Sequence, residues 1–305
     1  MQGFEVLEGG ISTSIQDLGR YGHIYLGITN SGAMDEYAYR WSQKLLDNKE
    51  NNDKKSNALE ILLVGLKLRA TDRTTLAVCG ADLDFRINDK KQPIWQTHYI
   101  NEGDIISFHQ QTKGLRTYLA VKDGFNVEKV HGSYATTLKE GIGQKLNKGD
   151  FLAFTPTQAK ETRHVPEKFI PKYSKYLTLN ILLSYQHDFF TEEQKEKFFS
   201  TDYKLTPQIS RMGYKLKGEA MIPSKGGIIS EGITFGAVQI PQNGQPIILL
   251  KERQTIGGYP KIGSVLPSDC FKLAQLPIGS MVRFREINIE DAEKEMKGFY
   301  DFFKS

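Results

Sequence analysis

The stretch ERQTIGGYPKIG, residues 252–263, presents Glu, Arg, Gln, Thr, Tyr and Lys side chains together with three glycines within twelve residues. It follows an apolar run, residues 246–251, that predicts a buried strand. The stretch offers a proton carrier, two hydrogen-bonding partners for an amide and a cation that can hold an anion: Glu252, Gln254, Thr255 and Lys261. Its two adjacent glycines and proline also suit a tight turn with Tyr259 packed beneath it, so spacing alone leaves both a turn and a ligand site open.

Other polar segments that contain glycine are spread along the chain, at residues 13–20, 30–35, 131–137 and 210–214. Glycine lets backbone N–H groups approach a ligand closely, and successive N–H groups can accept an anion. Carboxylates, amides and guanidinium groups beside them suit a small planar substrate that carries carboxylate or amide groups. Each of these segments, like residues 252–263, therefore suits contact with a small acid or amide.

Several familiar kinds of site are absent from the sequence. No Gly-Lys dipeptide occurs, which excludes a Walker-type phosphate loop, and no Gly-x-Gly-x-x-Gly follows a strand. The histidines show no metal-ligand spacing and there is no Gly-x-Ser-x-Gly elbow, so we predict neither a metal site nor a serine hydrolase. Cys79 and Cys270 lie far apart and are expected to be buried thiols.

The composition narrows the class of protein further. The net charge of +4 arises from 40 basic and 36 acidic residues that are mixed along the chain, whereas a nucleic-acid binder normally shows a basic stripe. The N-terminus lacks the basic and apolar regions of a signal peptide, and the apolar runs are far shorter than the roughly 20 residues that span a bilayer. We expect a cytoplasmic protein.

The elements that must position these side chains are mostly short strands. Runs of four to eight β-favouring residues are bounded by Gly, Pro, Asn or Asp, a spacing typical of barrels and sandwiches. They lie at residues 75–79, 104–108, 117–121, 151–154, 177–183, 236–240 and 247–250. Helical spacing is expected from Ser31 as a cap, after a capping box at Thr191, and from Asn288 to the end.

The polar segment between residues 155 and 176 contains three prolines and lacks clear periodicity, which indicates a domain boundary. We therefore expect a β-rich N-terminal domain over residues 1–155, a linker over 156–176, and a C-terminal domain over 177–305 that ends in a helix.

Several segments, in order along the chain, resemble one known family. They are SIQDLGRYG, SGAMDEYAYR, ALEILLVG, RTYLAVKDG, RMGYKLKG and GAVQIPQNGQPIILLKERQTIGGYPKIGSV. From about residue 4 to 286 the chain resembles the carboxyltransferase-domain proteins called KipA, allophanate hydrolase subunit 2 or the C subunit of 5-oxoprolinase (PxpC). The resemblance implies a mainly β fold with two cyclophilin-like β-barrel subdomains and a few peripheral helices.

The resemblance also implies which residues surround the pocket. The residues assigned to catalysis are Asp35, Glu252 and Lys261. The residues assigned to substrate binding are Gln16, Asp17, Arg20, Ser31, Arg211, Gln239, Gln254, Thr255, Gly257, Gly258 and Tyr259. Within these sets we expect Arg20 and Arg211 to bind an anion, and Asp35 and Glu252 to move or orient a proton.

The family's activity supplies the leading functional hypothesis. Members pair with a KipI-like (PxpB-like) subunit and a LamB-like (PxpA-like) subunit as an ATP-dependent 5-oxoprolinase, which opens 5-oxo-L-proline to L-glutamate. The resemblance thus implies a small amide or carboxylate substrate and ATP bound together with the partner subunits.

Two alternatives remain open. The family's Gly-Ser-Arg-Ser-Thr is replaced by residues 132–136, GSYAT, and its Gly-Pro-Gln by residues 184–186, SYQ. The missing positive charge at Tyr134 motivates a regulatory protein that binds a KipI-like inhibitor of a histidine kinase without turnover. The other alternative is the carboxyltransferase subunit of a biotin-dependent urea or amide carboxylase. Biotin would then arrive on another chain, because Lys297 lies in Glu-Met-Lys-Gly rather than in Ala-Met-Lys-Met.

Overall fold

The computed structural model describes residues 1–48, 55–158 and 162–304, and its contacts divide the chain into two compact units. The first unit comprises Met1–Tyr21 and Ser31–Tyr173, and the second comprises Gly22–Asn30 together with the chain from Ser174 onward. The division after Tyr173 falls inside the segment expected to be a linker. The short segment Gly22–Asn30, which the sequence placed in the first domain, belongs with the second unit.

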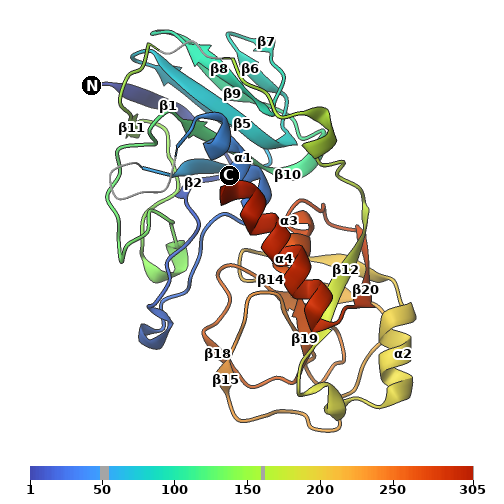
Figure 1. The fold of residues 1–305 in the computed structure, drawn as a ribbon. Helices are drawn as coiled ribbons and strands as arrows, with labels where there is room; N and C mark the ends of the chain where they lie inside the picture. The colour runs from blue at the N-terminus through green and yellow to red at the C-terminus, as the bar shows by residue number, and fades with distance from the viewer. Residues whose placement is uncertain (49–54, 159–161, 305) are drawn as a thin grey trace. The chain divides into compact units, whose positions relative to one another are not determined.

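The first unit is built from two antiparallel sheets (Figure 1). The six-stranded sheet has the order β11-β1-β4-β9-β6-β7, and the five-stranded sheet has the order β2-β3-β10-β5-β8. The strands are β1 (Gly3–Gly9), β2 (Ser12–Gln16), β3 (Ala58–Leu62), β4 (Leu66–Ala70), β5 (Thr74–Asp82), β6 (Phe85–Ile87), β7 (Lys90–Lys91), β8 (Gln96–Ile100), β9 (Ile105–Phe108), β10 (Lys113–Val121) and β11 (Phe151–Ala153).

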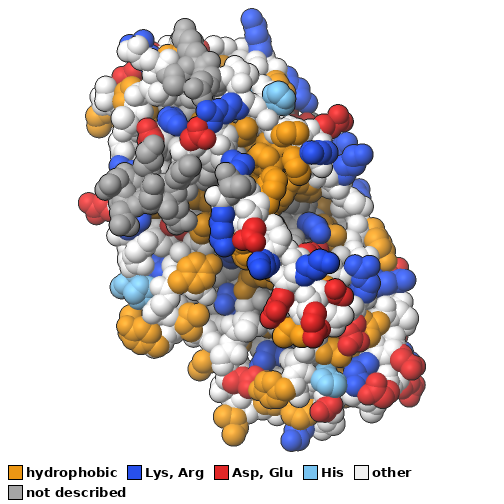
Figure 2. All heavy atoms as spheres, viewed as in Figure 1, with side chains coloured by type: hydrophobic (Ala, Val, Ile, Leu, Met, Phe, Trp, Pro, Cys, Tyr) orange, Lys and Arg blue, Asp and Glu red, His pale blue; other side chains and the backbone are white. Residues whose placement is uncertain are grey.

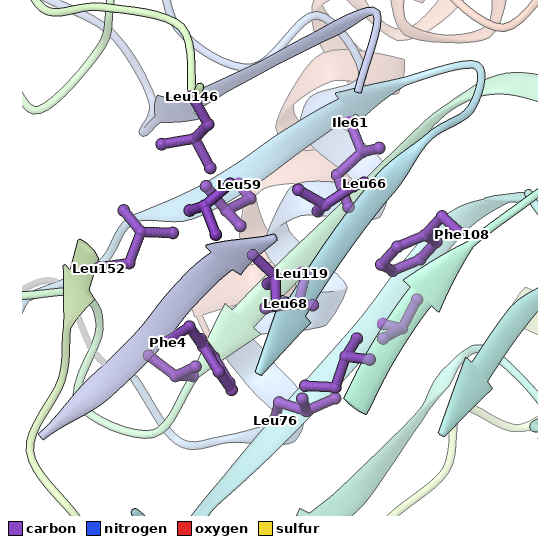
Figure 3. Close-up of a cluster of buried hydrophobic side chains, with 14 of the residues drawn as sticks. Phe4, Leu59, Ile61, Leu66, Leu68, Leu76, Phe108, Leu119, Leu146 and Leu152 are labelled. Atoms are coloured by element: carbon purple, nitrogen blue, oxygen red, sulfur yellow. The ribbon is translucent and has the colours of Figure 1, made fainter. Parts of the chain in front are cut away.

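The core of the first unit lies between these two sheets. Figure 3 shows side chains of both sheets pointing toward one another, with Phe4 and Leu68 from the six-stranded sheet and Leu59 and Leu119 from the five-stranded sheet. All of them are fully buried. Alternation along β1 and β4 places one face of each strand in this core, as the period of two in a pleated strand requires.

Helix α1 (Glu36–Leu45) covers the other face of the five-stranded sheet through contacts with β5 and β10. Because both of their faces are covered, these two strands are buried almost throughout. The helix begins after Asp35, which accepts a hydrogen bond from the backbone N–H of Ala38, and not after Ser31. Ser31 has a positive φ of 50°, a conformation outside the usual helix-cap geometry, so its expected capping role is wrong.

The first unit also contains two 3-10 turns, Leu138–Glu140 and Glu167–Phe169. The second unit contains two more, Ile24–Leu26 and His187–Phe189. The turn at residues 24–26 lies in the short segment that packs with the second unit.

The strands of the second unit close into a barrel with the order β12-β19-β16-β17-β14-β13-β20 (Figure 1). A parallel pairing of β12 with β20 completes the barrel. A two-stranded sheet, β15-β18, accompanies it. The strands are β12 (Tyr176–Leu183), β13 (Tyr203–Ile209), β14 (Gly213–Lys217), β15 (Glu231–Gly232), β16 (Ala237–Gln239), β17 (Ile247–Leu249), β18 (Ile256–Gly257), β19 (Lys261–Val265) and β20 (Met281–Glu286).

Helices α2 (Glu192–Ser200), α3 (Pro267–Leu273) and α4 (Ile289–Lys304) complete the second unit. The capping box expected at Thr191 is confirmed, because Thr191 and Gln194 exchange side-chain and backbone hydrogen bonds. Helix α4 also matches the expected C-terminal helix, and its Phe299 ring packs 5.5 Å from that of Phe271. Helix α3 was not expected from the sequence, because it is short and starts with a proline at a first-turn position.

The prediction of a mainly β fold is confirmed. The strands of the second unit form a closed barrel, whereas those of the first unit form two facing sheets. Both cysteines are buried, as expected. On the face shown in Figure 2, Lys and Arg side chains are interspersed with Asp and Glu. In the described parts of the chain, no helix combines the length and apolar character needed to cross a membrane.

Candidate functional site

Asp17 fixes the loop of residues 131–137 in the first unit. Its Oδ1 accepts a hydrogen bond from Ser133 Oγ at 2.8 Å, and its Oδ2 accepts one from the backbone N–H of Tyr134 at 2.7 Å. Oδ1 also accepts the backbone N–H of Gly19 at 2.8 Å. The carboxylate is buried and its contacts are to its own unit, an arrangement that stabilises the loop.

Gln16 and Ser31 hold the same loop from another side. Gln16 Nε2 and Ser31 Oγ both donate to the carbonyl oxygen of Thr136, at 3.1 and 3.0 Å. Both residues are fully buried. The positive φ of Ser31 brings its hydroxyl to this carbonyl instead of to a helix N-terminus.

Arg20 is also fully buried in the first unit. Its guanidinium donates to the carbonyl oxygen of Ala135 at 2.7 Å, to that of Val130 at 3.1 Å and to Thr137 Oγ1 at 3.2 Å. The guanidinium thus donates to two groups of the loop 131–137 and to Val130, which directly precedes it. The assignment of Arg20 to anion binding stays a prediction, and the observed contacts favour a role in stabilising the loop.

Asp35 belongs to a buried network of acids and tyrosines. Its Oδ1 caps helix α1, and its Oδ2 accepts a hydrogen bond from the hydroxyl of Tyr173 at 3.4 Å. Its backbone N–H donates to the hydroxyl of Tyr118, which donates to Glu60 Oε2 at 2.7 Å. Burial, and then the nearby carboxylates, raise the pKa of Tyr118 and Tyr173 well above the usual tyrosine range. Both hydroxyls therefore keep their protons and act as donors.

Arg211 and Glu252 form an ion pair within the second unit. The backbone N–H of Glu252 also donates to the carbonyl oxygen of Arg211 at 2.9 Å. Both side chains are mostly buried, with 21% and 11% of their surface exposed. The pair joins the loop that precedes β14 to the loop that follows β17, and each charge is compensated by the other.

Arg253, which was not assigned a role from the sequence, anchors the same loop. It donates to the carbonyl oxygen of Ile233 at 2.9 Å and to Asn30 Oδ1 at 3.2 Å. The neighbouring Gln254 and Thr255 line a cavity of about 10 Å³ beside Asn30, Ile233 and Arg253. This volume suits about one water molecule rather than a substrate.

Lys261 and Glu231 form the centre of a second polar cluster in this unit. Lys261 Nζ lies 2.5 Å from Glu231 Oε1, which also accepts a hydrogen bond from Gln186 Nε2 at 2.6 Å. Glu231 Oε2 accepts a hydrogen bond from the hydroxyl of Tyr185. The bonds from Lys261, and then from Tyr185, lower the pKa of Glu231. The cluster thus joins an ammonium group to a carboxylate that stays ionised at neutral pH.

Gln186 bonds to the backbone of Lys261 as well as to the carboxylate of Glu231. Its Oε1 accepts the backbone N–H of Lys261 at 2.8 Å, and Ser184 Oγ donates to the Lys261 carbonyl oxygen at 2.5 Å. The turn after β12 is therefore bonded to the start of β19. Gln186 is 2% exposed, and both the nitrogen and the oxygen of its side-chain amide form hydrogen bonds within the second unit.

Gln239 carries a buried amide nitrogen that lacks a hydrogen-bond partner among the residues that the structure describes. Its side chain is 3% exposed, and its Cα is paired with that of Lys261 between β16 and β19. A Cβ built on Gly257 would lie 2.9 Å from this nitrogen and 2.7 Å from Ile233 Cδ1, so the glycine allows the backbone to pass close to the amide. Gly257 is paired with Glu231 between β15 and β18, so the amide and the carboxylate flank the same glycine.

Gly258 and Tyr259 form the rest of the turn before Lys261. The carbonyl oxygen of Gly258 accepts the backbone N–H of Ile228 at 2.8 Å. Tyr259 is 46% exposed, so it does not form the buried floor of a tight turn, the alternative that the sequence left open. Their assignment to substrate contact stays a prediction.

Glu231, Tyr185 and Gln186 were absent from the sequence-based site. Residues 226–232 contain three glycines and one carboxylate, a composition that also suits an ordinary loop. The only available signal for Gln186 was the family's Gly-Pro-Gln, whose glutamine it retains. Pairing of β15 with β18 brings Glu231 to the cluster, and such a short pairing has no periodic signature.

The second unit therefore groups complementary hydrogen-bonding functions around Gly257. The Gln239 amide nitrogen is a donor without an acceptor among the described residues, Lys261 is a cation, and Glu231 is an acceptor. A buried donor costs free energy until it is paired, so this arrangement favours a ligand with an oxygen acceptor. In the described ranges, no group of three or more His, Cys, Asp or Glu side chains could hold a metal ion.

The predicted site residues fall into both units. Asp35 and the residues around the loop 131–137 lie in the first, whereas Arg211, Glu252 and Lys261 lie in the second. The convergence of these two groups on one cleft stays a prediction. The contacts within the second unit alone define the cluster around Lys261.

Comparison with known proteins identifies relatives along nearly the whole chain. The family model described as carboxyltransferase domain, subdomain A and B, matches residues 26–286. The C subunit of the 5-oxoprolinase of Escherichia coli (strain K12) is 30% identical over 98% of this chain and 96% of its own length. A putative urea carboxylase of Emericella nidulans is 26% identical over 97% of this chain, which corresponds to 25% of that protein.

A solved structure supports the same relationship. The crystal structure of the K. lactis urea amidolyase aligns with a TM-score of 0.90 and 26% identity over 99% of this chain and 20% of that chain. The resemblance found in the sequence segments is thereby confirmed at the level of both sequence and fold.

Proposed function

Because the chain belongs to the carboxyltransferase domain family, subdomains A and B, we propose that it is one subunit of an amide-processing enzyme. The reaction is the ATP-dependent opening of 5-oxo-L-proline to L-glutamate, performed together with a KipI-like and a LamB-like subunit. The relative that supports this choice is named as a subunit of 5-oxoprolinase and matches almost end to end. ATP is bound in the assembled complex.

The observation that carries the proposal is the buried amide nitrogen of Gln239, which has no hydrogen-bond partner in the part of the chain that the structure describes and lies beside the Lys261–Glu231 pair. One edge of a lactam presents an N–H donor next to a C=O acceptor. Glu231 can accept the N–H, while Gln239 Nε2 and Lys261 Nζ can donate to the oxygen. The cluster is thus complementary to this edge, and binding would satisfy the buried Gln239 donor.

The same contacts can assist the reaction. Addition of water to the lactam carbonyl carbon forms a C–O bond and places negative charge on the lactam oxygen, which Lys261 and Gln239 would stabilise. The C–N bond breaks when this intermediate collapses to the carboxyl group. The nitrogen leaves as an amine and needs a proton, which the Lys261 ammonium can supply. Gln186 positions Lys261, because its side-chain oxygen accepts the backbone N–H of Lys261. The Arg211–Glu252 pair fixes the loop that follows β17.

The test is ATP-coupled glutamate release by the chain co-expressed with its KipI-like and LamB-like partners. We expect Lys261→Ala and Glu231→Gln each to lower kcat/KM by about 100-fold, the usual cost of removing one group that stabilises developing charge. The double variant Glu252→Ala with Lys261→Ala should be inactive. Lys197→Ala is the matched control, because its exposed pair with Glu193 lies on helix α2. Activity of the double variant at the natural level would overturn the assignment.

A second candidate is carboxyl transfer to an amide, with carboxybiotin supplied by another chain. The alignment with a urea amidolyase over 99% of this chain favours it. The same donors would then bind the amide that accepts the carboxyl group. Retention of the chain on a carboxybiotin-carrier protein, without glutamate release by the assembled subunits, would select this candidate. Binding to a KipI-like protein without any turnover would instead select the regulatory alternative.

A further inference from the structure

Tyr185 is an exposed side chain held in place mainly by hydrogen bonds. Its residue is 73% exposed, so the ring gains little from burial. Its hydroxyl donates to Glu231 Oε2 and accepts a hydrogen bond from Gln186 Nε2 at 2.8 Å. The bond to Glu231 raises the pKa of the phenol, which keeps its proton for donation.

The two oxygens of Glu231 have different surroundings. Oε1 lies 2.5 Å from Lys261 Nζ and 2.6 Å from Gln186 Nε2, and both groups belong to the buried side of the cluster. Oε2 is contacted by the hydroxyl of Tyr185, whose ring faces solvent. A ligand N–H that approaches Glu231 can therefore reach Oε2 with the least rearrangement, and Tyr185 already occupies that position.

We propose that Tyr185 is a displaceable cap on Glu231 that the ligand must replace. In the empty site the phenol satisfies Oε2, and in the occupied site the N–H of an amide takes its place. The exposed ring can move away with a small loss of free energy, because little of its apolar surface is buried. This inference rests on the proposed amide-binding function and adds to it the group that competes with the ligand.

The cap makes Tyr185 a determinant of ligand selectivity. A ligand with an N–H donor restores the hydrogen bond that Oε2 loses when the phenol moves. A ligand without such a donor leaves the carboxylate oxygen unpaired, which costs free energy. The exchange thus favours amides over compounds of the same shape that lack the N–H.

The first test measures the dissociation constant of 5-oxo-L-proline by calorimetry on the full-length chain. We expect Tyr185→Phe to bind about 2- to 10-fold more tightly, since the hydrogen bond from the phenol to Glu231 no longer has to be broken. Tyr176→Phe is the matched control. Tyr176 is 43% exposed in the same unit, and its hydroxyl donates to Asp202 Oδ1 at 2.9 Å. An equal or weaker affinity of Tyr185→Phe would overturn the cap.

The second test follows the hydroxyl directly by NMR of tyrosine labelled with ¹³C at the ζ carbon. The Tyr185 signal is the one that disappears in Tyr185→Phe, and we expect it to shift when 5-oxo-L-proline binds. It should also shift in ligand-free Glu231→Gln, whereas the Tyr176 signal should stay in place. These shifts distinguish displacement from a general loosening of the fold.

The outcomes separate the two proposals. If 5-oxo-L-proline binds the natural chain and the Tyr185 signal does not move, the cap is wrong and the proposed function stands. If only Tyr185→Phe binds, the cap is supported in its strongest form. If neither protein binds, the proposed amide site is wrong and the cap is wrong with it.

Discussion

The loop network of the first unit and the Lys261 cluster of the second use similar side chains in opposite ways. Around Arg20, three donors are paired with carbonyl and hydroxyl groups of the same loop, and the guanidinium is fully buried. Around Lys261, the carboxylate of Glu231 is 31% exposed and the buried Gln239 nitrogen has no acceptor in the described structure.

This difference distinguishes polar groups that stabilise the fold from polar groups that can bind a ligand. A buried polar group that is fully bonded to its own backbone stabilises a loop and has nothing left for a ligand. A buried donor without an acceptor destabilises the empty protein and gains a partner when a ligand binds. The comparison therefore predicts that substitutions in the first network lower stability, whereas those in the second alter binding.

The largest expected effect is the loss of stability in Arg20→Met. The substitution leaves the carbonyl oxygens of Val130 and Ala135 without their charged donor, so we expect the free energy of unfolding to fall by about 3 kcal/mol. Urea denaturation provides the measurement. Arg69→Met is the control, because its exposed pair with Glu5 at 3.1 Å should contribute less than about 1 kcal/mol. Equal losses in the two variants would remove the contrast on which the comparison rests.

The second effect is a change of opposite sign in Gln239→Leu. Leucine has a similar shape and removes the unpartnered amide, so the ligand-free protein should gain about 1 kcal/mol of stability. Binding of 5-oxo-L-proline should weaken by at least about tenfold, because the donor to the lactam oxygen is lost. Denaturation and calorimetry on the same preparation test both parts. A variant that is less stable and still binds would show that the amide has a structural partner.

Much of the fold could be predicted from the sequence because it depends on patterns that are local. Short runs of β-favouring residues bounded by Gly, Pro, Asn or Asp indicate the strands, and the capping box of Thr191 and Gln194 indicates the start of helix α2. The start of α1 could not be placed in this way. Ser31 and Asp35 are both good caps by residue type, and only the backbone conformation of Ser31 decides between them.

The site was predicted less completely, for a physical reason. Residue type shows what Arg20 and Lys261 can do, but their roles depend on which partners the fold brings to them. Glu231 is brought to Lys261 by a two-stranded pairing that leaves no pattern in the sequence. Only the residues of the Lys261 cluster that lie in segments resembling the family, such as Gln239, could be assigned to it from the sequence.

A third prediction concerns the close approach of Gly257 to the Gln239 amide. In Gly257→Ala the new Cβ would lie 2.7 Å from Ile233 Cδ1 and 2.9 Å from Gln239 Nε2, so one of these side chains must move. We expect 5-oxo-L-proline to bind about tenfold more weakly, a loss of about 1.4 kcal/mol. Gly232→Ala is the matched control on the partner strand, because its Cβ would meet nothing within 4 Å. If both variants bind equally well, the position of the Gln239 amide beside Gly257 does not govern binding.

The smallest expected effect is the dependence of stability on the ionisation of Glu231. Its pKa is lowered from the ordinary value of 4.5 by Lys261 and Tyr185. A lowered pKa means that the stabilisation is present above pH 4.5 and is lost as pH falls through the folded-state value. The difference in unfolding free energy between the natural chain and Glu231→Gln should therefore be constant from about pH 7 to 5. It should stay below about 1 kcal/mol, because the pair is partly exposed, and should decrease as the pH falls through the lowered pKa of Glu231.

The matched substitution for this pH series is Glu192→Gln on helix α2, where Lys195 Nζ lies 2.6 Å from an 84% exposed carboxylate. Its effect should be smaller at every pH, because water competes for so exposed a pair. If Glu231→Gln instead changes stability as strongly as Arg20→Met, the Lys261 cluster supports the fold in the same way as the loop network. The distinction between the two regions would then rest on the unpartnered Gln239 nitrogen alone, since that group has no counterpart in the bonds that hold Arg20.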